Sequence, residues 1–293
     1  MSGSAAGFVP AHLVVEKPGA ARTAFVVHGI LGSAANWRSF VRRLVDASPV
    51  AAAWRWVLVD LRGHGESTAA PDSSGPNGPR GEPTPPHTVE ACAADLERLA
   101  GALGVDVELV LGHSFGGKVA LVFGDRHRAT RAAWLLDTPP GAVGQGGMSA
   151  SIDEVARVFE VIESVPEPLP GRAEVATAMR SAGLSEGLAQ WMTTNVRNAP
   201  DGYRWKFDLP TASALVENYA ALDLWPLVEA PRAGLEVVVV RGGRSSRFTD
   251  ADVARLDRLG ARACVIPEAG HWLHVDAPEA LAGLFEAAAR ALA

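Results

Sequence analysis

LVLGHSFGG, residues 109–117, is an apolar run that ends in the pattern G-x-S-x-G around Ser114. The pattern is typical of a nucleophile elbow, a sharp turn between a strand and a helix that presents a serine hydroxyl. It also arises by chance in a chain rich in glycine and alanine, so its context matters. A strand-like run over residues 107–111 precedes the serine, and a helix-like run over residues 118–126 follows it. This context predicts a strand, an exposed serine and a helix in that order.

Strand-like and helix-like runs alternate outward from this stretch in both directions. The expected strands cover residues 12–16, 23–27, 54–59, 107–111, 132–136, 235–240 and 263–266. Helices are expected at residues 36–45, 88–103, 118–126, 251–259 and 278–292. Such alternation predicts an α/β fold, in which helices cover both faces of a mostly parallel sheet of about eight strands.

The rhythm changes between residues 151 and 225, where helix-like segments follow one another without alternating strands. These segments cover residues 152–162, 172–182, 186–195 and 213–222. We therefore expect a core formed by residues 1–147 and 226–293, with a mainly helical cap inserted at residues 148–225. Residues 68–87 are rich in proline, glycine and serine, which predicts a surface loop without regular structure.

The composition is that of an ordinary globular protein. Of the 293 residues, 48% are hydrophobic and 20% are charged, and no window approaches the ~18 apolar residues that a membrane helix needs. A formal net charge of -6 argues against a nucleic-acid partner, because a surface that binds nucleic acid concentrates basic residues. We expect a small-molecule partner, no membrane span, and a monomer or small homo-oligomer.

The cysteines and the amino-terminal sequence bear on disulfides and location. Cys92 and Cys264 lie far apart in apolar sequence, which favours buried thiols over a disulfide framework or a metal site. Residues 1–10 match neither a secretory signal nor an Arg-rich transit peptide. The expected location is therefore the cytoplasm, and we expect neither a metal nor a cofactor.

A serine hydroxyl becomes a good nucleophile only when a histidine takes its proton and a carboxylate orients that histidine. His271 lies in the sequence AGHW, residues 269–272, between the last expected strand and the closing helix. The other histidines lie before the serine or lack such a loop, and His274 is expected to start a turn. His271 is therefore the candidate base.

The candidate acid is Asp137, directly after the strand at residues 132–136. A carboxylate placed after such an apolar run is costly unless it has a partner. The loop after the strand at residues 235–240 contains no carboxylate, and Asp250 and Asp252 are expected to begin the next helix. Ser245, in that loop, is either an additional hydrogen-bond donor to the triad or a turn residue.

An oxyanion that forms at the reacting carbonyl needs two fixed N–H donors. Phe115, the residue after the serine, is expected to supply one donor, and Ile30, or failing it Leu31, the other. Asp60 and His64 lie in a glycine-bearing turn after a strand, where we expect them to form structural hydrogen bonds.

With these residues in place, the chain resembles the α/β-hydrolase superfamily, and within it small bacterial esterases of the YbfF type and eukaryotic abhydrolase-domain relatives. The likeness covers residues 23–292 and rests on the sequences HGILGS (28–33), DLRGHGES (60–67), GHSFGGK (112–118), LLD (135–137), YRWKF (203–207), GGRS (242–245) and GHW (270–272). In that group the acid follows the sixth strand and a serine accompanies the triad, which supports Asp137 and Ser245. Two departures are Phe115, where methionine is more usual, and a longer loop at residues 68–86.

Together these observations predict a serine esterase or thioesterase that acts on small to medium acyl chains through an acyl-enzyme intermediate. Two alternatives stay open. The same fold supports other chemistry, such as perhydrolysis, C–C bond hydrolysis or acyl transfer. A relative without catalytic activity could instead use the pocket to bind a ligand.

Overall fold

The computed structural model describes residues 8–68, 87–143 and 149–292. Nearly all of the predicted surface loop at residues 68–87 lies outside these ranges, and so does residue 148, the expected start of the cap. Within the described ranges, no helix is long and apolar enough to cross a membrane.

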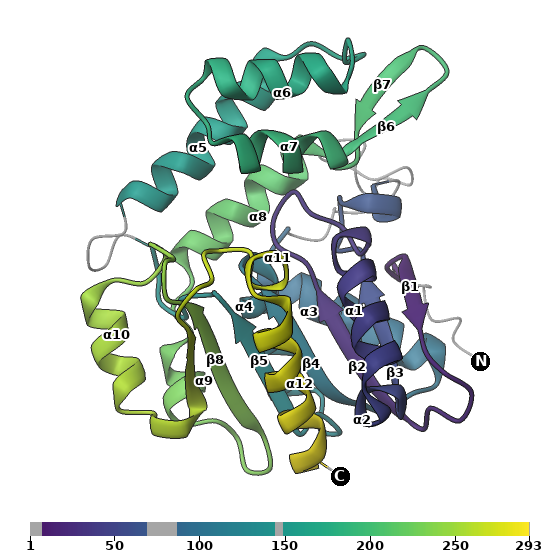
Figure 1. The fold of residues 1–293 in the computed structure, drawn as a ribbon, viewed down its shortest axis with the longest axis vertical. Coiled ribbons are helices and arrows are strands. Elements are labelled where there is room, and N and C mark those ends of the chain that lie inside the picture. Colours follow the sequence, from purple (N-terminus) through teal and green to yellow (C-terminus); the bar gives the residue numbers. More distant parts are fainter. Residues whose placement is uncertain (1–7, 69–86, 144–148, 293) are drawn as a thin grey trace, which may run out of the picture.

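A seven-stranded sheet runs through the centre of the molecule (Figure 1). Its order is β1-β3-β2-β4-β5-β8-β9, with β1 antiparallel to β3 and the other neighbours parallel. The strands are β1 (His12–Val15), β2 (Arg22–Val27), β3 (Trp54–Val59), β4 (Val107–His113), β5 (Ala132–Leu136), β8 (Glu236–Gly242) and β9 (Ala263–Ile266). The sheet contains every run predicted to be a strand, and among the described residues it has seven strands where about eight were expected.

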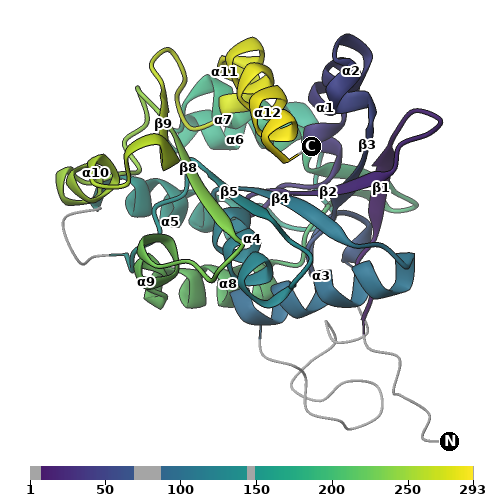
Figure 2. The same cartoon turned by 90° about the horizontal axis from the view of Figure 1, so that it is seen from below.

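Helices cover both faces of the sheet, as the alternation predicts (Figure 2). Successive residues of β4 point to opposite faces. Leu109 and Leu111 belong to the apolar layer that contains Trp37 and Phe285, whereas Val110 belongs to the layer that contains Phe123. The first layer is covered by α1 (Ala35–Ala47) and α12 (Pro278–Leu292), and the second by α3 (Val89–Leu103) and α4 (Phe115–Arg126).

Short elements complete the core. They are α2 (Pro49–Ala52), α9 (Trp225–Glu229), α10 (Asp250–Asp257), α11 (Leu273–Asp276) and the 3-10 turns Gly65–Ser67 and Gly260–Arg262. His274 is buried within α11, a helix of a single turn, which agrees with the expectation of a turn at this position.

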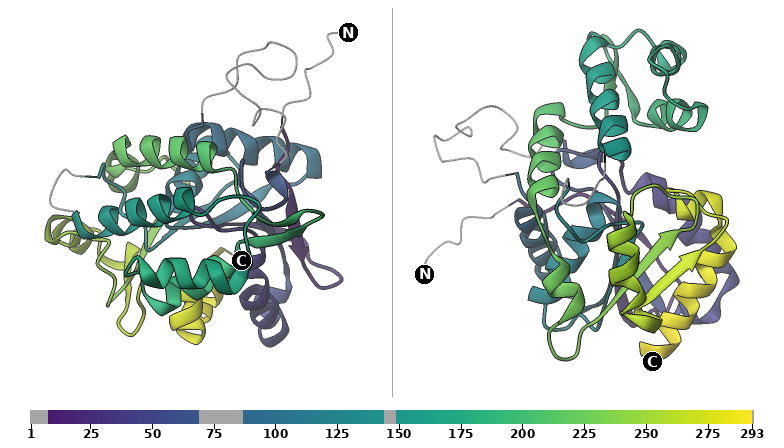
Figure 3. Two further views of the ribbon diagram at one scale, coloured as in Figure 1. Left: turned by 90° about the horizontal axis from the view of Figure 1, so that it is seen from above. Right: turned by 90° about the vertical axis from the view of Figure 1, so that its left-hand side faces the viewer.

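A second group of elements lies beyond the carboxyl edge of the sheet (Figures 1 and 3). It consists of α5 (Ser149–Ser164), α6 (Arg172–Ser181), α7 (Glu186–Thr194), β6 (Val196–Ala199) and β7 (Gly202–Trp205). We call residues 149–205 the cap segment. Its apolar interior is separate from the two sheet layers and includes Val175, Met179 and Met192.

The hairpin formed by β6 and β7 corrects the expectation of helices without strands in this region. Its strands have four residues each, too few for the alternation of apolar and polar residues to stand out from the sequence. The turn uses Gly202 at φ 138°, a backbone angle that favours glycine. A pairing of this length is typical of hairpins that depend on neighbouring helices for stability.

Helix α8 (Leu209–Ala221) connects the cap segment to the core. Its residue Ala212 packs into the cap interior, whereas Leu215 packs into the layer formed with α3 and α4. Asp208 caps the helix by accepting the Thr211 amide, so α8 begins four residues before the expected start.

Candidate active site

Ser114 occupies the turn between β4 and α4, as the G-x-S-x-G pattern predicts. Its backbone angles of φ 53° and ψ -121° are strained for a residue with a side chain. The flanking segments approach so closely that a Cβ at Gly112 would lie 1.9 Å from the Gly116 carbonyl oxygen, and one at Gly116 would lie 2.5 Å from the His28 carbonyl oxygen. Glycine at both positions is therefore a steric requirement of this turn.

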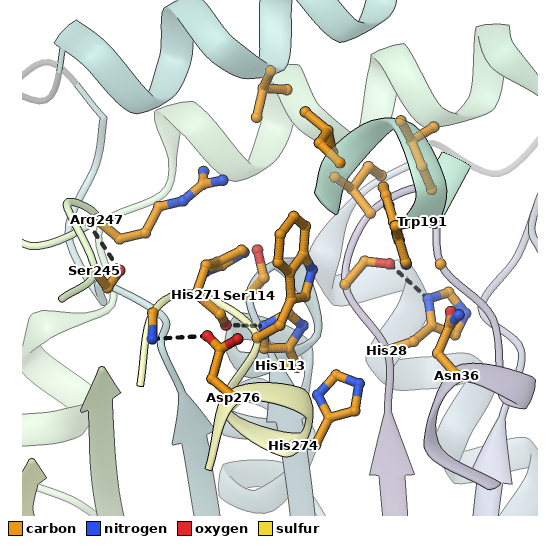
Figure 4. Close-up of a pocket in the computed structure, with 18 of the residues that line it drawn as sticks. His28, Asn36, His113, Ser114, Trp191, Ser245, Arg247, His271, His274 and Asp276 are labelled. Carbon is orange, nitrogen blue, oxygen red and sulfur yellow. Dashed lines mark hydrogen bonds between the residues drawn. The ribbon is translucent and has the colours of Figure 1, made fainter. Parts of the chain in front are cut away.

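His271 and Asp137 meet at the carboxyl edge of the sheet. His271 Nδ1 lies 2.7 Å from Asp137 Oδ2, although 134 positions separate the residues in sequence. Ser114 and His271 lie beside each other in one cavity (Figure 4). The structure thus brings together the three residues that the sequence singles out as nucleophile, base and acid.

Three donors converge on the Asp137 carboxylate. Its Oδ1 accepts the Gly242 amide at 3.0 Å, and its Oδ2 accepts the Ser245 hydroxyl at 2.6 Å together with the ring of His271. Burial raises the pKa of Asp137, while the bonds from Ser245 and Gly242 lower it. Three donors to two oxygens match an ionised carboxylate, which requires His271 to carry its proton on Nδ1 and leaves Nε2 as the basic nitrogen.

His271 sits at the wall of the cavity with 18% of its side chain exposed. Burial, followed by the positive charge of Arg247 and the neighbouring His274, holds the pKa of His271 well below its usual value. The imidazole is therefore neutral near pH 7, which is the state that a general base requires.

Two residues that the sequence analysis did not select hold the backbone around His271. The His113 ring lies 2.8 Å from the His271 carbonyl through Nε2, and because a carbonyl can only accept, Nε2 donates. Asp276 accepts the Gly270 amide at 2.8 Å. The adjacency of His113 to the serine is the one sequence signal that could have indicated its place.

Ile30 and Phe115, the two residues expected to supply oxyanion donors, both line the cavity space next to Ser114. Phe115 is the first residue of α4, so its amide has no partner within the helix. The Leu31 amide, by contrast, donates to His64 Nε2 at 3.1 Å, which makes Ile30 the better second donor. Leu31 nevertheless adopts φ 59°, and its strained backbone shapes the loop that carries Ile30.

Asp60 and His64 form structural hydrogen bonds, as expected. Asp60 accepts the amides of Ala34 and Glu66, and thereby joins the loop after β2 to the loop after β3. His64 lies 2.9 Å from the Arg62 carbonyl through Nδ1 and accepts the Leu31 amide through Nε2. Burial and the nearby His28 lower the pKa of His64 to about 3, so this ring is neutral.

The two alternative acids lie at the start of α10, as the sequence predicts. Asp252 forms a capping box with Thr249, accepting both its amide and its hydroxyl, and Asp250 is exposed at the first helical position. Among the interactions of the described residues, neither carboxylate contacts His271.

Two cavities meet at Ser114. The larger, about 350 Å³, is lined by His271, Trp191 and Trp272 and extends beneath α7 of the cap segment. The smaller, about 70 Å³, is mostly apolar and lies beside the serine, against α8 and the loop after β5. We call them the histidine-side cavity and the small chamber. The described residues contain no cluster of side chains suited to hold a metal ion.

Comparisons with known proteins agree with this geometry. The model of the alpha/beta hydrolase family matches residues 24–284. A mouse sn-1-specific diacylglycerol lipase, ABHD11, is 26% identical over 86% of this chain and 76% of its own length. Esterase YbfF of Escherichia coli is 26% identical over 87% of this chain and 88% of its own length.

A solved marine microorganism esterase superposes with a TM-score of 0.75 at 22% identity, covering 94% of this chain and 98% of its own. Together with the family match, this likeness confirms the expected α/β-hydrolase fold and the resemblance noted from the motifs.

Proposed function

Because this chain belongs to the alpha/beta hydrolase family, we propose that it is a serine hydrolase that cleaves carboxylic esters or thioesters through an acyl-enzyme intermediate. Relatives named as an esterase and a lipase support ester hydrolysis. The observation that carries the proposal is the 2.7 Å contact between His271 Nδ1 and Asp137 Oδ2 beside a serine on a strained turn.

In this proposal the Ser114 hydroxyl attacks the substrate carbonyl while His271 Nε2 takes its proton. Asp137 keeps the ring in the required tautomer and stabilises the imidazolium that forms, and Ser245 and Gly242 hold the carboxylate in place. The amides of Phe115 and Ile30 stabilise the oxyanion. His271 then returns the proton to the leaving group, and water attacks the acyl-enzyme by the same route.

The two cavities suggest how a substrate lies across the serine. The leaving group must receive its proton from His271, so it occupies the histidine-side cavity, which that residue lines. The acyl group then points the opposite way, into the small chamber lined by Phe115, Pro139 and Val216. A chamber of about 70 Å³ favours the short end of the small to medium acyl range.

The test is hydrolysis of an ester and thioester panel by the wild type and by Ser114→Ala. We expect hydrolysis by the wild type and a loss of kcat of about 10⁶-fold in the variant. Hydrolysis that survives the substitution would exclude Ser114 as the nucleophile. A wild type that hydrolyses no activated ester would favour a ligand-binding role.

A further inference from the structure

Lys118 is a fully buried cation one helical turn after Ser114. Its Nζ donates to the carbonyls of Gly141 at 2.8 Å, Tyr219 at 2.8 Å and Leu222 at 2.6 Å. The same Nζ lies 4.2 Å from the centroid of the Tyr219 ring, within range of a cation–π contact. An ammonium group has three N–H donors, so these three carbonyls use all of them.

The three carbonyls belong to two different segments. Gly141 lies in the loop after β5, the loop that begins with Asp137, whereas Tyr219 and Leu222 lie at the end of α8. Backbone hydrogen bonds join the same segments. The Val143 amide donates to the Ala220 carbonyl at 2.7 Å, and the Leu224 amide donates to the Pro140 carbonyl at 2.9 Å. Lys118 therefore ties this joined unit to α4, the helix that follows the nucleophile.

These two segments form a large part of the walls of the small chamber. Pro139 and Val143 line it from the loop, and Val216, Tyr219 and Ala220 line it from α8. Lys118 does not itself line the chamber. The distance between the serine and the chamber wall thus depends on a residue that a substrate would not touch.

A lysine is a costly residue at this position if its only task is to fill space. Burying an ammonium group costs free energy that hydrogen bonds must offset, and a methionine of similar length would fill the same volume without that cost. The carboxylates of Asp223 and Asp252 act on Lys118 by charge alone, since its hydrogen bonds all go to carbonyls. What lysine provides here is three directed donors at the junction of α4, α8 and the loop after β5.

We propose that Lys118 is a positioning residue that sets the acyl length accepted by the enzyme, because it fixes the wall of the small chamber. The inference rests on the proposed ester hydrolysis and adds a determinant of specificity to it. Without the three hydrogen bonds, the joined unit of α8 and the loop after β5 is held less firmly against α4, and longer acyl groups gain room beside Ser114.

The test compares kcat/KM for p-nitrophenyl acetate, butyrate, hexanoate and octanoate. In the wild type we expect acetate and butyrate to be preferred. Lys118→Met should shift the ratio of hexanoate to acetate in favour of hexanoate by about tenfold, within the range by which a hydrophobic pocket discriminates single methylenes. The change should appear mainly in KM for the longer ester. Lys118→Gln, which keeps two N–H donors, should give a smaller shift in the same direction.

Two further variants separate positioning from general loosening. Val122→Ala removes two methyl groups from a buried position of α4 outside the chamber, and it should leave the chain-length ratio unchanged despite lost stability. Ala220→Leu fills the chamber and should lower the butyrate-to-acetate ratio, whereas Ala221→Leu, at the next and exposed position, should not. Combined with Lys118→Met, Ala220→Leu should have a weaker effect, because the helix that carries it is held less firmly against α4.

The outcomes distinguish this inference from the proposed function. Ester hydrolysis with a chain-length ratio unchanged in both Lys118→Met and Lys118→Gln overturns the role of Lys118 and leaves the proposed function standing. If Lys118→Met does not fold, the ratio measured for Lys118→Gln decides. A wild type without any ester hydrolysis overturns both.

Discussion

The site around Ser114 has a side formed by the core and a side formed by the cap segment, and the two are built in different ways. On the core side, Ser114 and Asp137 sit at φ 53° and φ 49° at the ends of buried strands, and hydrogen bonds fix the groups around them. On the cap side, the wall comes from apolar and aromatic side chains such as Val158, Leu188 and Trp191. The core side holds the reacting groups in fixed positions, as bond making requires. The cap side provides apolar surface against which a substrate can pack.

This difference indicates that the core side serves catalysis and the cap side serves substrate binding. Leu31 is the third residue with a side chain that adopts a positive φ among the described residues, and it too lies at the core side. Strain of this kind persists only where the surrounding structure determines the backbone. Substitutions of the strained and hydrogen-bonded groups around Ser114 should therefore affect kcat, whereas substitutions in the cap-side wall of the histidine-side cavity should affect which leaving groups are bound.

The largest effect should follow from removing the charge of the core-side acid. Asp137→Asn keeps the shape of the side chain but favours the wrong tautomer of His271, so kcat should fall by about 10⁴-fold. Asp250→Asn is the matched control and should stay within about twofold of the wild type, since surface substitutions of this kind change little. Steady-state kinetics on one activated ester measures both. A larger loss for Asp250→Asn than for Asp137→Asn would contradict the division drawn above.

A smaller effect is expected on the cap side. Trp191 lines the histidine-side cavity, and its ring centroid lies 6.0 Å from that of Trp272 across the gap between cap segment and core. Trp191→Ala should raise KM by about tenfold for esters with large apolar leaving groups, because buried aromatic surface is lost, and should change kcat little. Gln190→Ala, at the exposed neighbouring position, is the control. A fall in kcat with unchanged KM would place Trp191 with the catalytic groups instead.

The smallest effect concerns the pH dependence of kcat/KM, which is set by the pKa of His271. Because burial and Arg247 lower the pKa of His271, the base stays neutral down to acidic pH. The acid limb of kcat/KM should therefore lie below pH 6.5. Arg247→Gln removes a positive charge that favours the neutral ring, so the limb should move to higher pH, by about one unit at most. Circular dichroism at each pH checks folding. An acid limb that moves to lower pH in Arg247→Gln is the contrary result.

The core side could be predicted from the sequence because steric and chemical requirements leave few choices there. Gly112 and Gly116 are needed wherever strand and helix approach this closely, and a carboxylate after a buried strand needs a partner. The placement of Asp137 followed from its position after β5 and from the lack of a carboxylate in the loop after β8. The elbow also predicted the order of β4, Ser114 and α4 correctly.

The cap side was predicted less well for a physical reason. The hairpin of β6 and β7 is short, and its stability depends on contacts with helices that the sequence does not place in space. The roles of His113 and Lys118 were not predicted either, because each acts on carbonyls of segments far along the chain. The division into core and cap at residues 148–225 remains a prediction, since α8 packs against both parts.

The most direct test of the central claim is covalent labelling of the nucleophile. The protein would be treated briefly with a fluorophosphonate, which reacts with activated serines, and then analysed by intact mass and by peptide mapping. We predict one adduct, located at Ser114 within the peptide that spans β4 and α4, and a strong reduction of labelling in Asp137→Asn. A protein that acquires no adduct, or acquires it on a residue other than Ser114, would contradict the account.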